Sequence, residues 1–290
     1  MSHPILTICV PVYNGERYLR QCVDSLLSQT FGDFALLISD NASTDGTRTI
    51  CESYAAADRR VRYHRHEVNV GMYGNFNFLL GSVRSKYVKI ANADDYWSPT
   101  MVHDALRELE NDASIGLCYP MMVMVDGDGT VTGNYEYRLH IMDDDAATRF
   151  RRVLTEIRLV NQLTGVIRMD AVRRALPLVH HTVGDRIYLA DLSLYGKIFH
   201  LDEYQYFRRF HERSSSYSRG SEAHQVTYVL AAGAKKLRYE AWKYHSALLR
   251  RASRAPLGTV RKAKLLTWLL RGAVWDRQRL SADLFAAARG

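Results

Sequence analysis

The sequence predicts an α/β protein whose first part is a Rossmann-like arrangement of parallel strands and helices. Two observations lead to this prediction. Short, almost continuously apolar runs alternate with stretches of helical periodicity, and each run ends in a polar, turn-forming cluster. Strands that are apolar at nearly every position are typical of parallel sheets covered on both faces. With 290 residues, 47% apolar and 24% charged, the chain is long enough for one such domain and an appendage.

The elements follow one another in a βαβαβαβ order up to about residue 120. The apolar runs that predict the first strands are residues 6–12, 34–39, 61–64 and 87–91, with a longer strand at 115–125. Helical periodicity marks residues 18–29, a helix that opens near Thr44, with Ser43 or Thr44 as its cap, and residues 99–111, where proline stands in the first turn. From residue 225 onwards the pattern is helical, and a Ser/Arg/Gly loop at Ser214–Gly220 marks the boundary.

Composition narrows the class of protein further. The start of the chain has no basic region and no cleavage site of a signal peptide, and its apolar runs are too short to span a bilayer, so we expect a cytoplasmic protein. The four cysteines stand apart from one another, which predicts buried free thiols. Residues 208–290 carry 18 Lys/Arg against 5 Asp/Glu, net +13, whereas residues 1–207 carry 21 against 26, net −5. The basic tail predicts an anionic partner.

Ligands of open α/β sheets bind beyond the carboxyl ends of the strands. In this chain every early strand ends in a polar cluster, and these clusters should meet at one edge of the sheet. Each cluster alone is ordinary, because Asx turns and helix caps use the same residues. The four clusters are Pro11–Glu16, Asp40–Gly46, Asn69–Gly71 and Asn92–Asp95.

In order and spacing, these four clusters resemble the inverting family-2 glycosyltransferases of the GT-A fold, over roughly the first 215 residues. The resemblance implies a catalytic domain of residues 1–215, with a nucleotide-sugar-binding half (1–112) and an acceptor-binding half (113–215), followed by a basic helical extension (216–290). It implies that Tyr13 flanks the nucleotide base and that Asp40 accepts a hydrogen bond from its ring NH, which suits uridine or thymidine. The donor-binding residues that it implies are Pro11, Tyr13, Asn14, Glu16, Asp40, Asn69, Gly71, Asn92, Ala93, Asp94 and Arg208.

The resemblance also implies a divalent cation, Mn²⁺ or Mg²⁺, at the diphosphate. Asp94 matches the last acidic residue of the family's DxD motif, and His211 matches the histidine of its closing Arg-x-x-His segment, so these two are the expected metal ligands. Arg208 or Arg209 would offset phosphate charge. The sequence departs from the motif at Asn92, which stands where the first Asp is usual, and Asp95 could compensate for the missing charge.

In the acceptor half, inversion by a single displacement needs a carboxylate that takes the proton of the acceptor hydroxyl. The resemblance places this general base at the start of a helix, which matches Asp185, with Asp191 in reserve; the alternative is that Asp185 only caps that helix. The preceding segment, residues 162–167, resembles the strand before this helix, with Gly165 giving room for the acceptor.

These expectations combine into an inverting transferase that moves a sugar from a UDP- or dTDP-sugar to a saccharide or lipid-linked saccharide, in cell-surface polysaccharide synthesis. Dinucleotide and P-loop enzymes are disfavoured because the sequence has neither a GxGxxG after the first strand nor a GKS/GKT motif. A sugar-nucleotide pyrophosphorylase would need a Gly-rich basic loop after the first strand. The open alternative is a degenerate protein of the same fold that binds nucleotide or glycan without turnover. Residues 225–290 lack the aromatic interleaving of nucleic-acid readers, so we expect them to meet the inner face of a membrane or to pack on the body.

Overall fold

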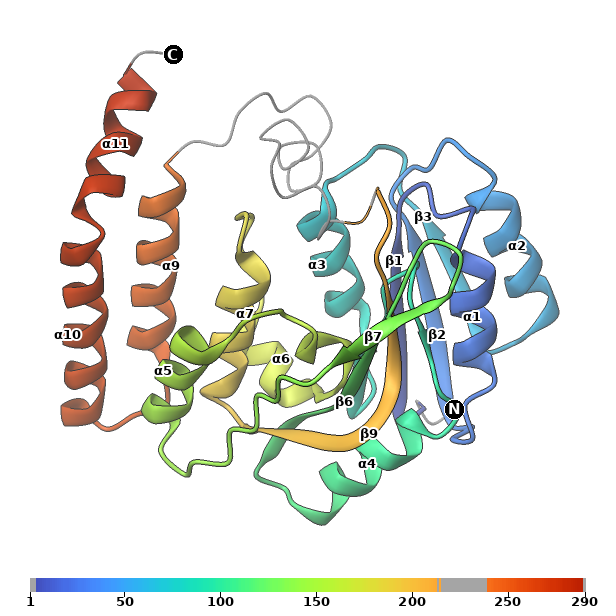
Figure 1. Ribbon diagram of the computed structural model, residues 1–290, viewed down its shortest axis with the longest axis horizontal. Coiled ribbons are helices and arrows are strands. Elements are labelled where there is room, and N and C mark those ends of the chain that lie inside the picture. Colours follow the sequence, from blue (N-terminus) through green and yellow to red (C-terminus); the bar gives the residue numbers. More distant parts are fainter. Residues whose placement is uncertain (1–3, 213, 215–238, 289–290) are drawn as a thin grey trace.

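The computed structural model describes residues 4–212, 214 and 239–288. Figure 1 shows the elements in order along the chain. The strands are β1 (Leu6–Val12), β2 (Phe34–Asp40), β3 (Val61–Arg65), β4 (Tyr87–Ile90), β5 (Tyr96–Trp97), β6 (Ile115–Val125), β7 (Val131–Tyr135), β8 (Val166–Arg168) and β9 (Lys197–Arg209). The helices are α1 (Leu19–Leu27), α2 (Thr47–Ala57), α3 (Met72–Ser82), α4 (Met101–Asn111), α5 (Ala146–Glu156), the 3₁₀ turn η1 (Gln162–Thr164), α6 (Met169–Ala175), α7 (Gly184–Ser193), α9 (Glu240–Arg254), α10 (Thr259–Trp275) and α11 (Arg277–Ala288).

The strands form one sheet in the order β3-β2-β1-β4-β8-β6-β9-β5, and β7 pairs with β6 at its side. The first four strands are parallel, as expected, with Leu6 paired to Phe34 and to Tyr87. Their carboxyl ends therefore lie at one edge. Beyond β4 the sheet becomes mixed, because β8 runs antiparallel to both β4 and β6 while β6 and β9 are parallel.

Most predicted strands and helices lie within a few residues of the observed ones, and the differences are informative. The helix predicted to open near Thr44 begins at Thr47, and its cap is Gly46, so the expected cap at Ser43 or Thr44 was wrong. Helix α3 was missed, because its apolar residues (Phe76, Phe78, Leu79 and Leu80) surround the helix and leave little periodicity.

The segment 162–167 also differs from its prediction. It forms η1 and only then the short strand β8, which leads into α6 and not directly into α7. A Cβ atom at Gly165 would lie 2.2 Å from the Cys118 carbonyl oxygen and 2.7 Å from Tyr119 Cβ. This glycine is therefore required for the close approach of the chain to β6, and its expected role in admitting the acceptor stays a prediction.

Helices cover both faces of the sheet, which explains the nearly continuous apolar strands. On one face α1 and α2 pack against the parallel strands and α4 packs against β6 and β8, within one cluster that includes Leu19, Ile50 and Met101. On the other face α3 and α5–α7 pack around Phe150, and α9 and α10 join this second cluster through Leu248, Leu265 and Leu269. All four cysteines are buried and free, as expected.

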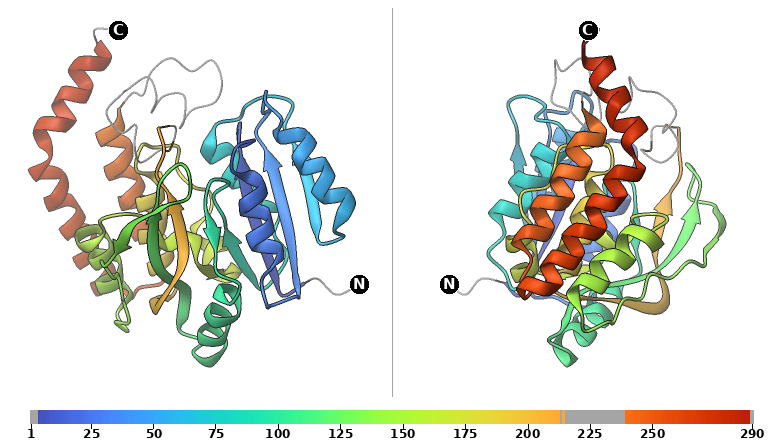
Figure 2. Two further views of the ribbon diagram at one scale, coloured as in Figure 1. Left: turned by 45° about the vertical axis from the view of Figure 1, so that its right-hand side comes forward. Right: turned by 90° about the vertical axis from the view of Figure 1, so that its left-hand side faces the viewer.

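Helices α9–α11 stand at the side of the molecule farthest from β3 and α2, and α5–α7 lie between them and the parallel strands (Figures 1 and 2). The predicted boundary at Ser214–Gly220 and the first predicted helical residues, such as Val226 and Leu230, fall almost wholly outside the described residues. Among the residues that are described, none of the helices combines the length and the apolar character needed to cross a membrane.

Candidate active site

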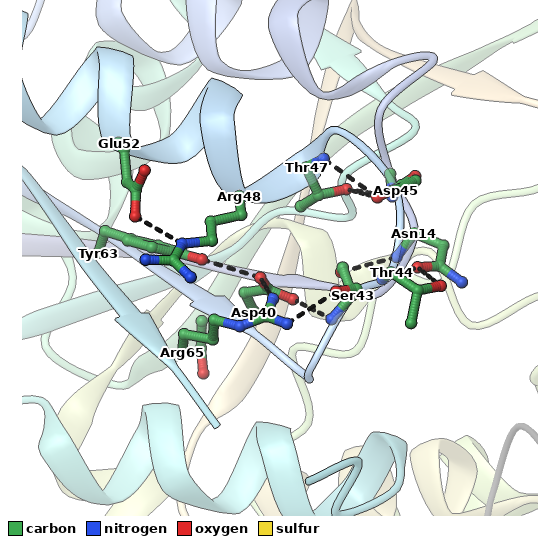
Figure 3. A network of polar contacts seen from close by, with 12 residues as sticks. Asn14, Asp40, Ser43, Thr44, Asp45, Thr47, Arg48, Glu52, Tyr63 and Arg65 are labelled. Atoms are coloured by element: carbon green, nitrogen blue, oxygen red, sulfur yellow. Dashed lines mark hydrogen bonds and ion pairs between the residues drawn. The ribbon is translucent and has the colours of Figure 1, made fainter. Parts of the chain in front are cut away.

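The loops that follow β1 and β2 are tied together at the carboxyl edge of the sheet (Figure 3). Asn14, whose φ is +52°, donates its backbone N–H to Ser43 Oγ at 2.9 Å and accepts the Thr44 N–H at 2.8 Å through Oδ1. Glu16 Oε2 accepts the Gly46 N–H at 2.9 Å. Asn14 and Glu16 therefore shape the edge by fixing one loop against the other, and their contact with a donor stays a prediction. Tyr13, next to Asn14 in the chain, is 49% exposed, so its ring is accessible for stacking.

Asp40 lies beneath these loops, and its side chain is fully buried. Oδ1 accepts the Ser43 N–H at 2.7 Å, and Oδ2 accepts the Tyr63 hydroxyl at 2.8 Å and an ion pair from Arg65. The Arg65 guanidinium, which is 32% exposed, also donates to the Ser43 carbonyl at 2.8 Å. A base that approaches this carboxylate therefore meets Arg65 beside it (Figure 3).

The third cluster belongs to the same hydrogen-bonded frame. Asn69 Oδ1 accepts from Asn41 Nδ2 at 2.9 Å and from the Gly71 N–H at 2.8 Å. Gly71 has a φ of +77° and caps α3, so a glycine is favoured at this position for conformational reasons. The frame thus holds the start of α3 against the loop after β2.

In the fourth cluster, two adjacent aspartates have opposite environments. Asp95 is 2% exposed and accepts the Tyr206 hydroxyl at 2.6 Å, the Arg209 N–H at 2.8 Å and Asn92 Nδ2 at 2.9 Å. Burial, reinforced by the neighbouring Asp94 charge, raises the pKa of Asp95 to about 7. Asp95 is thus a fixed joint between this loop and β9, and the expectation that it could compensate for Asn92 was wrong.

Asp94 faces outwards and meets the residue predicted as its metal-binding partner. Its Oδ2 lies 3.1 Å from His211 Nε2, with side-chain exposures of 33% and 13%. The His211 ring packs against Tyr18, with 4.9 Å between the ring centroids. One carboxylate oxygen and one imidazole nitrogen fit Mn²⁺ or Mg²⁺ as part of a coordination shell. Among the described residues no group of three or more such side chains occurs, so the remaining ligands would be diphosphate oxygens and water.

The two arginines of β9 point to different environments. Arg209 is 3% exposed and donates to the carbonyls of Asp94 (3.1 Å) and Asp126 (3.0 Å) and to Gln21 Oε1 (2.5 Å). It therefore holds the β6–β7 turn and the Asp94 backbone in place. Arg208 is near enough to Asp95 for its charge to oppose the rise of that pKa. Of the two, Arg208 is the one whose charge lowers the pKa of Asp95.

The start of α7 meets the carboxyl edge of the parallel strands through Tyr73, in the first turn of α3. The Tyr73 hydroxyl accepts the Asp185 backbone N–H at 3.3 Å. A Cβ atom at Gly184 would lie 2.4 Å from the Val179 carbonyl oxygen and 2.7 Å from Tyr73 Cζ, so a glycine is needed here for this close approach. The predicted base, Asp185, and the loop that starts α3 are therefore neighbours.

Asp185 stands in the first turn of α7, and the residue that caps this helix is Val183. The alternative that Asp185 is the cap was therefore wrong, and its Oδ1 accepts the adjacent Arg186 N–H at 2.8 Å. Asp191, the reserve candidate, is 1% exposed and pairs with Arg251 of α9 at 2.9 Å, which removes it from contact with an acceptor.

Sequence reasoning missed four residues that shape this site, namely Tyr63, Arg65, Tyr73 and Tyr206. Tyr63 and Arg65 had a readable signal, because they lie two residues apart at the end of a predicted strand and so share a face. Tyr73 and Tyr206 had none, since their roles depend on contacts between distant segments.

Comparisons with known proteins identify the family to which most of the chain is similar. A family model described as glycosyl transferase family 2 matches residues 7–173. The glycosyltransferase GlyA of Streptococcus pneumoniae serotype 4 is 32% identical over 117 residues, 39% of this chain and 17% of GlyA. A chondroitin synthase of Escherichia coli is 31% identical over 131 residues, 45% of this chain and 19% of the synthase. The chain thus spans less than a fifth of these two relatives.

Two solved structures share the fold at low sequence identity. S. aureus TarS 1–349 in complex with UDP-GlcNAc has a TM-score of 0.64 and 19% identity, over 91% of this chain and 71% of TarS. The mannosyltransferase PcManGT from Pyrobaculum calidifontis, in complex with GDP-Man and Mn²⁺, has a TM-score of 0.55 and 16% identity, over 100% of this chain and 76% of PcManGT.

Proposed function

The chain belongs to glycosyl transferase family 2 and has the GT-A fold, and from this premise we propose that it transfers one sugar, with inversion, from a nucleoside-diphosphate sugar to a saccharide acceptor. The observation that carries the proposal is the Tyr73 contact with Asp185. This contact, made by the Asp185 backbone N–H, brings the first turn of α7 next to the start of α3, which follows the carboxyl end of β3. A reaction between two bound substrates needs this proximity.

The donor in this proposal is a UDP- or dTDP-sugar. Uracil and thymine present an NH between two carbonyl oxygens. Arg65 offers a donor for one of these oxygens, and the NH would reach the fully buried Asp40 once Arg65 shifts from that carboxylate towards the base. Guanine presents one carbonyl oxygen followed by two N–H donors. Two neighbouring donors fit a carboxylate that has no arginine beside it. The exposed Tyr13 ring would cover the face of the base.

A divalent cation, Mn²⁺ or Mg²⁺, would be held by Asp94 and His211 at the diphosphate. Bound there, it would neutralise the charge of the departing nucleoside diphosphate as a Lewis acid. Arg208 adds positive charge to the same loop. The metal dependence of PcManGT is suggested by the Mn²⁺ of its structure, and we extend it to this chain as part of the proposal.

Asp185 is the general base of the proposed reaction. Its carboxylate takes the proton of the acceptor hydroxyl while that oxygen bonds to the anomeric carbon from the face opposite the phosphate. The bond from the anomeric carbon to the phosphate oxygen breaks, and the nucleoside diphosphate leaves with the electron pair. One displacement inverts the configuration at that carbon.

The setting that we propose is polysaccharide synthesis, as in the relatives named as chondroitin synthase and hyaluronan synthase. The acceptor would be a growing saccharide, either free or linked to a lipid. The tail residues 225–290 would bring the enzyme to a membrane in the second case.

A second candidate, a degenerate binding protein without turnover, is favoured only by Asn92, whose amide binds Asp95 and brings no charge to the motif. Donor hydrolysis separates the two. We expect the chain to release nucleoside diphosphate slowly from a UDP- or dTDP-sugar with Mn²⁺, and Asp94→Ala to stop this release. Donor binding without release in the presence of saccharide acceptors would favour the degenerate protein.

A further inference from the structure

The outer side of α10 is an apolar surface that no described element covers. Its large apolar side chains are exposed to unusual degrees: Trp275 is 85% exposed, Val260 68%, Val274 60% and Leu270 52%. In Figures 1 and 2 α10 stands at the outer side of the molecule, with α9 beside it. Contiguous exposed apolar side chains usually mark a contact surface.

These residues share one face because of their spacing. By helical periodicity Val260, Leu270, Val274 and Trp275 fall on one side of α10, together with the polar Thr267 and the basic Arg271. The opposite side carries Leu265 (1% exposed) and Leu269 (5%), which join the core beside α9. The helix is therefore amphipathic in an unusual way, with apolar residues on both its inner and its outer side.

The charges of α10 are of one sign. It contains four basic residues, Arg261, Lys262, Lys264 and Arg271, and no acidic one. Lys264 and Arg271 lie on the outer face itself, one and three turns after Val260. Arg279 of α11, 79% exposed, is paired with Asp276 at 3.8 Å and adds no net charge to this face. The outer face is thus apolar and basic together, and we call residues 260, 264, 267, 270, 271, 274 and 275 the α10 outer face.

This combination selects among possible partners. Nucleic acid would be attracted by the basic residues, but the apolar side chains would gain nothing on a phosphate backbone. A second copy of this face, related by a two-fold axis, would set Lys264 and Arg271 against their own equivalents. A bilayer with anionic lipids satisfies both parts at once, because apolar side chains enter the headgroup boundary while basic ones meet phosphates. Tryptophan is favoured at that boundary.

We propose that the α10 outer face is a docking surface for an anionic phospholipid bilayer, with Trp275 and Val274 inserted at the headgroup boundary and Lys264 and Arg271 on lipid phosphates. The sequence predicted a membrane contact for the basic tail as a whole, whereas this proposal assigns the contact to one side of α10. With α10 on the bilayer, α5–α7 lie nearer to it and β3 and α2 farthest (Figures 1 and 2). A lipid-linked acceptor would then enter the half that contains Asp185. That last step rests on the proposed transferase function, whereas docking does not.

The test measures co-flotation of the full chain with vesicles of phosphatidylcholine alone or with about one-third phosphatidylglycerol. We expect binding to the anionic vesicles only, weakened by salt. The double variant Val274→Ser/Trp275→Ser should lose roughly tenfold or more of this binding, and Lys264→Gln/Arg271→Gln should lose a similar factor. The matched control Arg84→Gln/Arg107→Gln removes the same charge from the body and should bind as the original chain does.

Melting temperature and UDP binding of each variant show that the fold and the donor site are intact, so a failure of docking is distinguishable from a failure of the transferase proposal. The proposal is overturned if the original chain does not bind anionic vesicles, or if Val274→Ser/Trp275→Ser binds them equally. Self-association that the same double variant abolishes, without vesicle binding, would assign the face to a second copy and also overturn it.

Discussion

At the scale of single residues, neighbours in the sequence have separate tasks. Asp94 and Asp95 are adjacent in the chain. Asp94 faces His211, whereas Asp95 is buried and accepts hydrogen bonds from the Tyr206 hydroxyl and the Arg209 N–H. The same division separates Arg208 from Arg209. A turn directs successive side chains to opposite sides, and no residue type in the sequence records which side faces the ligand.

The proposed base gives the first prediction. Asp185→Asn removes the proton acceptor but keeps the size of the side chain, so sugar transfer should fall by about 10²–10⁴-fold. Donor affinity, measured by calorimetry with UDP or dTDP and Mn²⁺, should stay close to that of the original chain. Asp170→Asn, on an 86% exposed carboxylate of α6, is the matched control and should transfer normally. Near-normal turnover of the Asp185 variant would mean that another group is the base.

A second residue-scale prediction concerns the base of the nucleotide. Arg65→Ala removes the donor beside Asp40, so affinity for uridine diphosphate should fall by roughly tenfold, as for the loss of one charge-assisted hydrogen bond. Arg62→Ala changes an exposed arginine of the same strand and should leave the affinity unchanged. If titrations give both variants the same affinity for uridine diphosphate, Arg65 does not contact the base.

At the scale of elements, close approaches between segments decide the geometry. Gly165 brings η1 and β8 against β6, and the Cβ of an alanine there would lie 2.2 Å from a carbonyl oxygen. We expect Gly165→Ala to lower the free energy of unfolding by about 1–3 kcal/mol or more, as overpacking does. Gly32→Ala, with no atom within 4 Å of the new Cβ, is the matched control. Urea unfolding of the two variants checks this, and equal midpoints would contradict it.

The joint between α7 and α9 gives a pH prediction. Burial raises the pKa of Asp191 to about 7 against the opposing charge of Arg251. An acid with a raised pKa in the folded state stabilises the fold at low pH, and this contribution is lost as the pH rises from about 4 towards 7. The free energy of unfolding should therefore fall across this range, by up to about 1 kcal/mol per pH unit from this one group.

Asp191→Asn should remove that part of the slope, and urea unfolding at pH 5, 6 and 7 measures it. Asp128→Asn, on an 86% exposed carboxylate, should keep the original slope. Parallel pH profiles for Asp191→Asn and the original chain would show that Asp191 is not the group that titrates.

The elements also show what the sequence reveals and what it hides. Strands β1, β2, β4 and β6 were predicted almost to their ends, because continuous apolar runs are a local signal. The parallel half followed from that pattern. Helix α3 did not, because its apolar residues surround the helix, and the antiparallel strand β8 did not, because its partners are distant in the chain. The closure of Asp40 by Arg65 was missed although the ends of two neighbouring strands bring the two residues together. The convergence of Asp94 with His211, 117 residues apart, was reached only through the family resemblance.

At the scale of the whole molecule, the described residues form a sequence of layers. The parallel strands with α1 and α2 lie at one side, α5–α7 in the middle, and α9–α11 at the far side (Figure 1); Asp185 belongs to α7. In the proposed reaction, donor, acceptor and membrane would meet these layers in that order. Residues 225–290 were predicted as one basic tail. The exposed apolar side chains of α10 could be identified only from the structure, which shows which side of this helix is buried.

The central claim is that the carboxyl edge of the sheet binds a pyrimidine nucleoside diphosphate together with a divalent cation. It is tested most directly by thermal unfolding of the full chain with UDP, dTDP or GDP, each with and without Mn²⁺, beside Asp94→Ala as a variant. A ligand that binds only the folded state raises the melting temperature. We expect UDP or dTDP to raise it only with Mn²⁺, GDP to raise it less, and Asp94→Ala to abolish the effect. The claim is contradicted if no nucleotide changes the melting temperature, or if UDP raises it equally with and without Mn²⁺.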